Sequence, residues 1–450
     1  MTEGWIPDLA RAGIKHQAIA EALGGAIERG ALRAGERLPP QRELAARLGV
    51  DLTTVTKAYD AVRHRGLIEA RGRAGSFVRG PQTVAPDELE RADAGMNLPP
   101  ELPGNLLART IAASFTELLN GGSPLRLQYQ PAGGAAEDRA AGARLLAQLG
   151  LPAAPGQVLV AAGGQNALHA ILAATLEPGD AVACARYVYP GFRALAERLG
   201  IVLVPLPELT GDALRAACAA QPVKALYCVP TNDNPTTATL SPETRRGLAQ
   251  AAEDCGLQVI EDDAYAPLAA DPLPPIAALV PHRSWHVAST SKIVSPALRV
   301  AFVRAPDPPA AARLAPDLHR TAIMAPPLNV ALVCHWIADG TYARLTGLMR
   351  REAVERQRLA REILAGIAFA AHPQGYHMWI PLTGAATPET IARRLRPTGL
   401  SAVPAERFAA AGGGEAALRV SLGGPIGPDR LAEGLRLLRT LAADPHTLPG

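Results

Sequence analysis

Five side chains between residues 231 and 299 have the chemical types that a covalently held organic cofactor requires. They are Asn234 in an Asn-Pro-Thr run, Asp262 and Tyr265 in Asp-Asp-Ala-Tyr, Lys292 in Ser-Thr-Ser-Lys, and Arg299. A lysine amine can join an aldehyde, a carboxylate can keep a ring nitrogen protonated, and an arginine can pair with a phosphate as a fork. Together these groups predict a binding site for a pyridine ring that bears an aldehyde and a phosphate.

The apolar runs that precede these residues predict where the residues lie. Lys292 comes just beyond the run 285–289, and Asp262 comes directly after the run 257–261, so each follows an expected strand. Ligands collect at the carboxyl ends of parallel strands. We therefore expect the amine and the carboxylate to share one site.

Further residues supply donors for a phosphate. The hydroxyls of Ser289 and Ser291 flank the same strand end, and Gly164 and Gln165 open a helix after the expected strand 158–162. Free amides at a helix start face an anion. Taken singly, these features also fit a surface lysine, a helix cap and a glycine turn. Their order along the chain favours a pyridoxal phosphate site, because all the parts that this chemistry needs are present.

Strand-like and helical patterns alternate over the larger part of the chain. Strands are expected at 158–162, 181–185, 201–205, 225–229, 257–261, 285–289 and 300–303, and helices at 165–176, 191–199, 212–219 and 242–255. This alternation predicts an α/β fold with a mostly parallel sheet covered on both faces. After about residue 340, a helix-rich stretch and short strands near 378–382 and 419–422 predict a smaller subdomain.

The motifs GGQNAL, VYPG, NPTTAT, EDDAY and STSKIVSPALR, in that order, resemble those of fold-type I aminotransferases over about residues 97–440. The resemblance implies that Lys292 is the Schiff-base lysine, Asp262 is the partner of the pyridine nitrogen, and Tyr189 stacks on the ring. It implies that Asn234 and Tyr265 hold the phenolic oxygen. The implied phosphate ligands are Gly164, Gln165, Ser289, Ser291 and Arg299.

Two more residues gain roles from the same resemblance. Tyr129 resembles the tyrosine that reaches the phosphate of the partner subunit in a head-to-tail homodimer, and Arg419 resembles the arginine that clamps a substrate carboxylate. The chain departs from the pattern at Thr237, where most such enzymes have glycine, and at Gly164, which lacks a hydroxyl that some relatives use. Neither departure removes an essential part.

The first eighty residues have a different pattern. Helices are expected at 14–29, 41–48 and 51–65, followed by short strands at 67–69 and 76–78. Gly49 closes the second helix, and the carboxylate of Asp51 can cap the first amides of the third. A helix, a tight turn and a second helix with a polar start can place that start in the major groove of DNA.

The candidate DNA contacts lie on this approach and on a glycine-flanked hairpin tip, whose arginines could reach phosphates or the minor groove. They are Arg42, Thr53, Thr54, Lys57, Arg71 and Arg73. Residues 1–80 hold 13 Lys and Arg against 9 Asp and Glu, a net charge of +4, whereas the whole chain has +3. A basic segment of this kind favours nucleic-acid binding. A small helical cap with a solvated basic face is the alternative.

The string LPPQRELAARLGV, followed by TTV, Tyr59 and RGLI, resembles the winged helix of GntR-type repressors over about residues 14–79. This longer string favours the DNA-binding interpretation. The chain has Leu52 and Thr56 where many relatives carry arginines in the recognition helix, which leaves open which side chains read bases.

Composition sets the remaining bounds. The 450 residues, 48% of them hydrophobic, suffice for about three domains. Five scattered cysteines without a CxxC pair indicate neither a disulfide framework nor a metal site, which fits a reducing cytosol. The N-terminus lacks the features of a signal peptide. The longest charge-free run, 145–176, is broken by prolines and glycines, so no membrane span is expected.

A GntR-type winged helix joined to an aminotransferase-like domain is the architecture of the MocR subfamily, which the whole chain resembles. The expected organisation is a DNA-binding domain at 1–79, a polar linker at 80–95 and a pyridoxal phosphate domain at 96–450. The resemblance implies a cytoplasmic transcriptional regulator that binds promoter DNA and senses the cofactor or its adduct with an amino-acid-like effector. An active aminotransferase with a DNA-binding head is the alternative, and a regulator without cofactor is a third, disfavoured by the complete set of residues.

Overall fold

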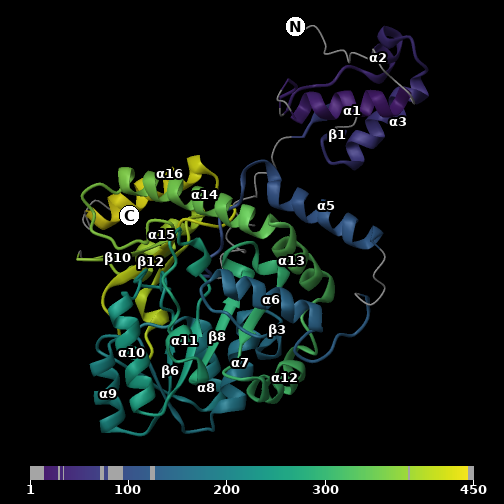
Figure 1. Cartoon of the computed structure of the whole chain (residues 1–450). Coiled ribbons are helices and arrows are strands. Elements are labelled where there is room, and N and C mark those ends of the chain that lie inside the picture. The colour runs from purple at the N-terminus through teal and green to yellow at the C-terminus, as the bar shows by residue number, and fades with distance from the viewer. Residues whose placement is uncertain are drawn as a thin grey trace. The chain divides into compact units, whose positions relative to one another are not determined.

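The computed structural model describes residues 15–28, 31–33, 35–70, 75–79, 95–121, 127–383 and 386–443 (Figure 1). The chain divides into two compact units, Met1–Ala85 and Pro86–Gly450. The hairpin-tip arginines Arg71 and Arg73 lie outside the described residues, as does most of the expected linker.

The described part of the first unit contains three helices and two antiparallel strands, in the expected order. The elements are α1 Lys15–Glu28, α2 Gln41–Leu48, α3 Leu52–His64, β1 Ile68–Ala70 and β2 Ser76–Val78. Ile19 and Leu23 of α1 pack with Val55 and Tyr59 of α3 in one buried core. The hydroxyl of buried Tyr59 donates to the Pro39 carbonyl at 2.8 Å, so the apolar core holds no unmatched phenol.

The turn between α2 and α3 agrees with the sequence-based prediction at Gly49 and differs from it at Asp51. Gly49 adopts a left-handed conformation at φ +60° and closes α2, as expected. Asp51 occupies the residue position before α3, but its side chain accepts no capping hydrogen bond, so the expected cap is wrong. The backbone carbonyl of Asp51 already accepts from the amide of Thr54 at 3.0 Å, and the exposed carboxylate is left to solvent.

The second unit is built on a seven-stranded sheet in the order β3-β9-β8-β7-β6-β4-β5. Only β9 runs antiparallel to its neighbours, which confirms a mostly parallel sheet. The strands are β3 Val158–Ala161, β4 Ala181–Cys184, β5 Val202–Pro205, β6 Val223–Cys228, β7 Gln258–Asp262, β8 Ser284–Ser289 and β9 Ala301–Arg304.

Helices cover both faces of this sheet, as the alternation of patterns predicts (Figure 1). Successive residues of a strand point to opposite faces, so Ala225 and Tyr227 of β6 join one core while Leu226 and Cys228 join another. The first core is covered by α6 Ala136–Gln148, α7 Gly164–Thr175, α8 Pro190–Leu199, α12 Pro308–Ala322 and α13 Pro327–Asp339. The second is covered by α9 Gly211–Ala220, α10 Pro242–Asp254 and α11 Ile276–Leu279.

A smaller antiparallel sheet, in the order β10-β12-β11, follows in the chain with its own helices. It comprises β10 His377–Pro381, β11 Ala402–Pro404 and β12 Ala417–Ser421, with α14 Thr341–Ile363, α15 Pro388–Leu395 and α16 Pro428–Ala443. The sequence predicts β10 and β12 but not β11, which has only three residues and includes a proline. Helix α5 Leu106–Asn120 precedes the large sheet.

Short 3₁₀ turns join several of these elements. They are η2 Pro103–Asn105, η4 Pro155–Gln157, η5 Ala266–Leu268, η6 Pro281–Arg283, η7 Thr290–Lys292, η8 Pro296–Leu298, η9 Arg396–Thr398 and η10 Ala405–Phe408. Within the described ranges, none of the helices combines the length and the apolar character needed to cross a membrane. In the same ranges, no group of three or more His, Cys, Asp or Glu side chains converges as a metal site.

Candidate functional site

The parallel pairing of β7 with β8 brings the carboxylate and the amine to one edge of the sheet. Asp262 is the last residue of β7 and lies opposite Val287 of β8. After β8, the short turn η7 carries the chain to Lys292. Because both strands end at the same edge, the two side chains line one pocket.

This pocket, here called the lysine pocket, has about 650 Å³ of empty space. The structure brings together there every residue that the sequence proposes as a cofactor ligand, except Tyr129. The expected residues that line it are Gly164, Gln165, Tyr189, Asn234, Asp262, Tyr265, Ser289, Ser291, Lys292 and Arg299. Tyr129 has 79% of its surface exposed and does not line the pocket of its own chain.

Asp262 is held in a low-dielectric setting. Its side chain is 8% exposed, and the hydroxyl of Tyr227 on β6 donates to it at 3.2 Å. Burial raises the pKa of Asp262 to about 6, while the hydrogen bond from Tyr227 acts in the opposite direction. The sequence analysis missed Tyr227, although a tyrosine within the apolar run ALYCV is a polar group that needs a buried partner.

The Lys292 amine lies in the same region as two other cations. Enclosure by the protein, together with the positive charges of Arg419 and Arg299, lowers the pKa of Lys292 to about 8, against the opposing effect of Asp262. The Nζ atom donates to the backbone carbonyl of Asn97 at 2.6 Å. An amine with a depressed pKa is neutral, and therefore nucleophilic, nearer to neutral pH.

One side of the pocket is a cradle of amides and hydroxyls. Gly163, at φ +84°, turns the chain so that Gly164 begins helix α7 with free amides. A Cβ atom at Gly163 would lie 2.7 Å from the guanidinium of Arg299, so only glycine allows this close approach. The hydroxyl oxygen of buried Ser291 has no hydrogen-bond partner among the described residues. Such an arrangement suits an anion.

Two tyrosines and an amide complete the lining. Burial raises the pKa of Tyr189 and of Tyr265, so both phenols are protonated. The hydroxyl of Tyr265 accepts a hydrogen bond from the Asn97 side chain at 3.0 Å. Asn234 is 8% exposed, and its Oδ1 atom has no partner among the described residues. Buried polar atoms are seldom left unmatched, so these groups suit a polar ligand.

Arg419 approaches the pocket from the smaller sheet. It lies in the middle of β12, is fully buried, and places its guanidinium 5.8 Å from the centre of the Phe408 ring. Its Nη2 atom donates to the backbone carbonyl of Gly95 at 2.5 Å. The contact of Arg419 with Gly95, like that of Lys292 with Asn97, was not expected from the sequence. Nothing in the run GMNLPPE distinguishes a pocket-lining segment.

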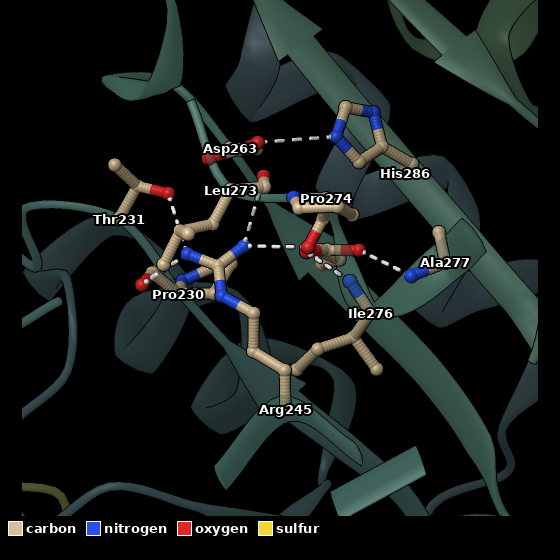
Figure 2. A network of polar contacts seen from close by, with 10 residues as sticks. Pro230, Thr231, Arg245, Asp263, Leu273, Pro274, Ile276, Ala277 and His286 are labelled. Carbon is tan, nitrogen blue, oxygen red and sulfur yellow. Dashed lines mark hydrogen bonds and ion pairs between the residues drawn. The ribbon is translucent and has the colours of Figure 1, made fainter. Parts of the chain in front are cut away.

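A network of polar contacts, drawn in Figure 2, holds the start of the loop that carries Asn234. Arg245 of α10 is buried and donates to the carbonyl of Pro230 at 2.9 Å and to the hydroxyl of Thr231 at 3.0 Å. It also donates to the carbonyl of Pro274 at 3.0 Å. One guanidinium therefore ties the start of the 230–241 loop to the segment before α11.

The carboxylates on either side of Asp262 are not among the residues that line the pocket, and they have their own partners. Glu261 accepts from the amides of Ile276 at 2.9 Å and Ala277 at 2.7 Å at the start of α11. Asp263 lies 3.4 Å from His286, and Figure 2 marks this contact with a dashed line. Burial alone would lower the pKa of His286, but Asp263 and Glu261 outweigh it and raise that pKa. Asp262 is thus the carboxylate of the three that faces the ligand space.

Four of the six candidate DNA contacts lie on α2 and α3 of the first unit. Arg42 of α2 and Thr53 and Lys57 of α3 are exposed, and Thr54 is half-buried. Thr56 donates to the side chain of Gln41 at 2.9 Å, which ties α3 to α2.

Comparisons with known proteins agree with this architecture. Residues 97–433 match the family "Aminotransferase class I and II", and residues 15–78 match "Bacterial regulatory proteins, gntR family". The chain is 30% identical to the HTH-type transcriptional regulator YdeF of Bacillus subtilis, over 98% of this chain and 97% of that protein. It is also 30% identical to the vitamin B6 salvage pathway transcriptional repressor PtsJ of Salmonella typhimurium, over 78% and 82% of the two chains.

Among solved structures, the α-aminoadipate aminotransferase LysN of Thermus thermophilus aligns with a TM-score of 0.68 and 27% identity, covering 77% of this chain and 91% of that one. The second unit is therefore a fold-type I aminotransferase domain, the fold of enzymes that use pyridoxal phosphate. With its GntR-type head, the chain belongs to the MocR subfamily of transcriptional regulators.

The depressed pKa of Lys292 predicts the pH dependence of covalent attachment at the pocket. Only the neutral amine attacks an aldehyde, so the rate at which pyridoxal phosphate attaches should rise with pH to a midpoint near 8, rather than near the ordinary lysine value of 10.5. Stopped-flow absorbance on cofactor-free protein from pH 6.5 to 10 measures this rate. Lys292→Ala provides the background from other lysines. A midpoint at or above 10 would contradict the electrostatic description of the site.

Proposed function

We propose that the chain is a transcriptional regulator whose aminotransferase-like domain holds pyridoxal phosphate and responds to an amino-acid-like compound. The observation that carries the proposal is the meeting of Lys292 and Asp262 at adjacent strand ends, in a chain that begins with a GntR-type domain. The name of the relative PtsJ, a repressor of vitamin B6 salvage, supports a link between such a pocket and gene control. A cytoplasmic location follows from this function.

The pocket residues fit pyridoxal phosphate. The hydroxyl of Ser291 and the amide of Asn234 offer buried polar atoms without partners among the described residues, and the start of α7 offers amides. In this assignment Gly164, Ser289 and Arg299 hold the phosphate together with Gln165 and Ser291. Asn234 and Tyr265 hold the phenolic oxygen. When bound, the cofactor supplies an aldehyde that joins amines and a ring that draws electrons from them.

Asp262 would hold the ring nitrogen in its protonated form. Its pKa of about 6 reflects burial, and a cation placed beside it would lower that value and keep the carboxylate charged. The Tyr227 hydroxyl orients this carboxylate from β6. Tyr189 would cover one face of the ring, since it directly precedes α8 and lines the same pocket.

Arg419 and Lys292 together define the effector class. Arg419 offers a buried guanidinium, which pairs with carboxylates as a fork, and its charge reaches the Lys292 amine. A compound with an amine for the aldehyde and a carboxylate for Arg419 satisfies both groups. An amino acid or a close analogue is therefore the effector that this geometry favours.

An active aminotransferase is the second candidate. It is favoured by the joint presence of Lys292, Asp262 and Arg419 in one domain. The LysN structure is described as a complex with N-(5′-phosphopyridoxyl)-L-leucine, an amino acid joined to the cofactor, in a related fold. The two candidates differ in whether an amino acid changes promoter affinity or is converted repeatedly.

The sensing function predicts a response that depends on both pocket groups. A DNA fragment selected from a random pool by the protein serves as the probe, and each standard L-amino acid is added in turn to cofactor-loaded protein. At least one amino acid should change the affinity for the fragment by about 5–150-fold, the usual range for coupled sites. Arg419→Ala should reduce the response while the cofactor still attaches, and Lys292→Ala should abolish attachment. Repeated conversion of an amino acid and a keto acid, with unchanged DNA affinity, would favour the enzyme instead.

DNA binding should depend on the α3 surface through phosphate and base contacts. Lys57→Ala should weaken binding to all sequences alike. It should also reduce the slope of log affinity against log salt concentration by about one, because one fewer counterion is released. Thr54→Ala should change the preference among sites. Fluorescence anisotropy at several salt concentrations measures both effects. Lys224→Ala, an exposed lysine of the second unit, is the control. Equal results for Lys57→Ala and Lys224→Ala would contradict the assignment.

Tyr129 should complete the site of a partner subunit. Its exposure in its own chain supports the head-to-tail dimer that the aminotransferase fold implies. Tyr129→Phe should weaken cofactor binding about tenfold, because a hydrogen bond to a charged group contributes about 1.5–3 kcal/mol. The decisive protein is a hybrid of one Tyr129→Phe subunit and one Lys292→Ala subunit. If Tyr129 acts across the dimer, the subunit that keeps Lys292 receives the intact Tyr129 of the other subunit. The hybrid then has one site of wild-type affinity. If the hybrid has only weak sites, Tyr129 acts within its own chain.

A further inference from the structure

Residues Gly95, Met96 and Asn97 form a short segment at the lysine pocket, here called the pocket strap, that contacts two cationic side chains. The carbonyl of Gly95 accepts from Arg419 at 2.5 Å, and the carbonyl of Asn97 accepts from Lys292 at 2.6 Å. Met96 lines the pocket between them. Three consecutive residues thus contact both groups that the proposed function assigns to the effector.

The Asn97 end of the strap is firmly held. Asn97 is 2% exposed, and its side chain donates to the Tyr265 hydroxyl at 3.0 Å and accepts from the Ser421 hydroxyl at 2.8 Å. It also lies 3.2 Å from Nδ1 of His377. Burial lowers the pKa of His377 to about 3, so its ring is neutral and can accept at Nδ1 while Nε2 donates to the Asp233 carbonyl at 2.9 Å. These contacts fix Asn97 to the smaller sheet and to the segment that follows β7.

The Gly95 end differs from the Asn97 end. Gly95 adopts φ +68°, a backbone conformation that residues with a side chain adopt only with strain. The direction of its carbonyl toward Arg419 therefore depends on the glycine. In the sequence, Gly95 directly follows residues 80–94, which lead back to the GntR-type domain. A change at this end of the strap is therefore a change at the end of the covalent connection between the two units.

We propose that the Gly95 carbonyl is a latch on the carboxylate subsite, which an effector carboxylate displaces from Arg419. This inference rests on the proposed function. A carboxylate is the stronger partner, because it carries a negative charge and can accept two parallel N–H bonds from the guanidinium, whereas the Gly95 carbonyl is uncharged. Arg419 is buried, and a buried charge without a partner is unfavourable. The guanidinium therefore gives up the Gly95 carbonyl only when the carboxylate replaces it. The latch opens when the carboxylate arrives.

The amine of the effector acts at the opposite end of the strap. In this structure the free Lys292 amine donates to the Asn97 carbonyl. An effector amine that replaced Lys292 at a bound cofactor would return Lys292 to this free form. Asn97 is then held while Gly95 is released. The strap pivots about Asn97 only for compounds that carry both an amine and a carboxylate. An amine alone reacts with the cofactor but leaves the latch closed.

Hydrogen exchange of the strap amides tests the latch in the full-length, cofactor-loaded protein. The probes are each standard L-amino acid, and ethylamine as an amine without a carboxylate. The visible spectrum of the cofactor reports reaction at the pocket in the same samples. An amino acid that changes the spectrum should speed exchange at residues 95–97 by about fivefold or more, the lower end of usual couplings. Ethylamine should change the spectrum without this effect.

A variant pair adds a second measurement. Gly95→Ala disfavours the latched conformation and should raise the affinity for the responding amino acid several-fold, because less competition remains at Arg419. Gly256→Ala is the matched control, since Gly256 has φ +69° and a Cβ there meets nothing within 4 Å. It should leave the affinity unchanged. A purely structural role for Gly95 would lower the affinity or leave it unaltered.

The outcomes separate the two proposals. If no amino acid changes the spectrum, the proposed function fails and the latch fails with it. If an amino acid changes the spectrum but the exchange of residues 95–97 stays the same, or rises equally with ethylamine, the latch alone is overturned. Faster exchange with the amino acid only, together with tighter binding by Gly95→Ala, supports the latch.

Discussion

The parallel pairing of β7 with β8 is the constraint on which the whole site depends. It places the ends of two buried strands side by side, and so sets the Asp262 carboxylate and the Lys292 amine in one pocket. Burial opposes charge on both groups: it raises the pKa of the acid to about 6 and lowers the pKa of the amine to about 8. This arrangement favours a ligand that forms a covalent bond with the Lys292 amine and donates a hydrogen bond to the Asp262 carboxylate.

The surrounding structure makes this burial tolerable. The run Glu261, Asp262 and Asp263 places three carboxylates at one strand end, and each has a different partner. Glu261 accepts the amides that begin α11, and Asp263 contacts His286. Asp262 receives the Tyr227 hydroxyl. Because an unmatched buried charge is costly, these partners are what allow Asp262 to face the ligand space in a charged form.

The sequence predicts the parts of the fold that repeat and the site residues that sit at strand ends. Strands and helices of the second unit agree with their expected ranges to within a few residues, since each is an apolar run bounded by turn residues. Asn97 and Gly95 could not be predicted, because their contacts with Tyr265 and Arg419 span 168 and 324 residues. Such contacts follow from the path of the chain in space, which no local pattern records.

The central claim is that occupancy of the lysine pocket and binding of DNA are coupled, and reciprocity tests it most directly. If an amino acid changes the affinity for a selected DNA fragment by some factor, that fragment must change the affinity for the amino acid by the same factor. Titrating cofactor-loaded protein with the amino acid, with and without saturating DNA, and with the visible spectrum as readout, measures the second factor. Equal factors above about fivefold are predicted. An amino-acid affinity that is identical with and without DNA would contradict the account.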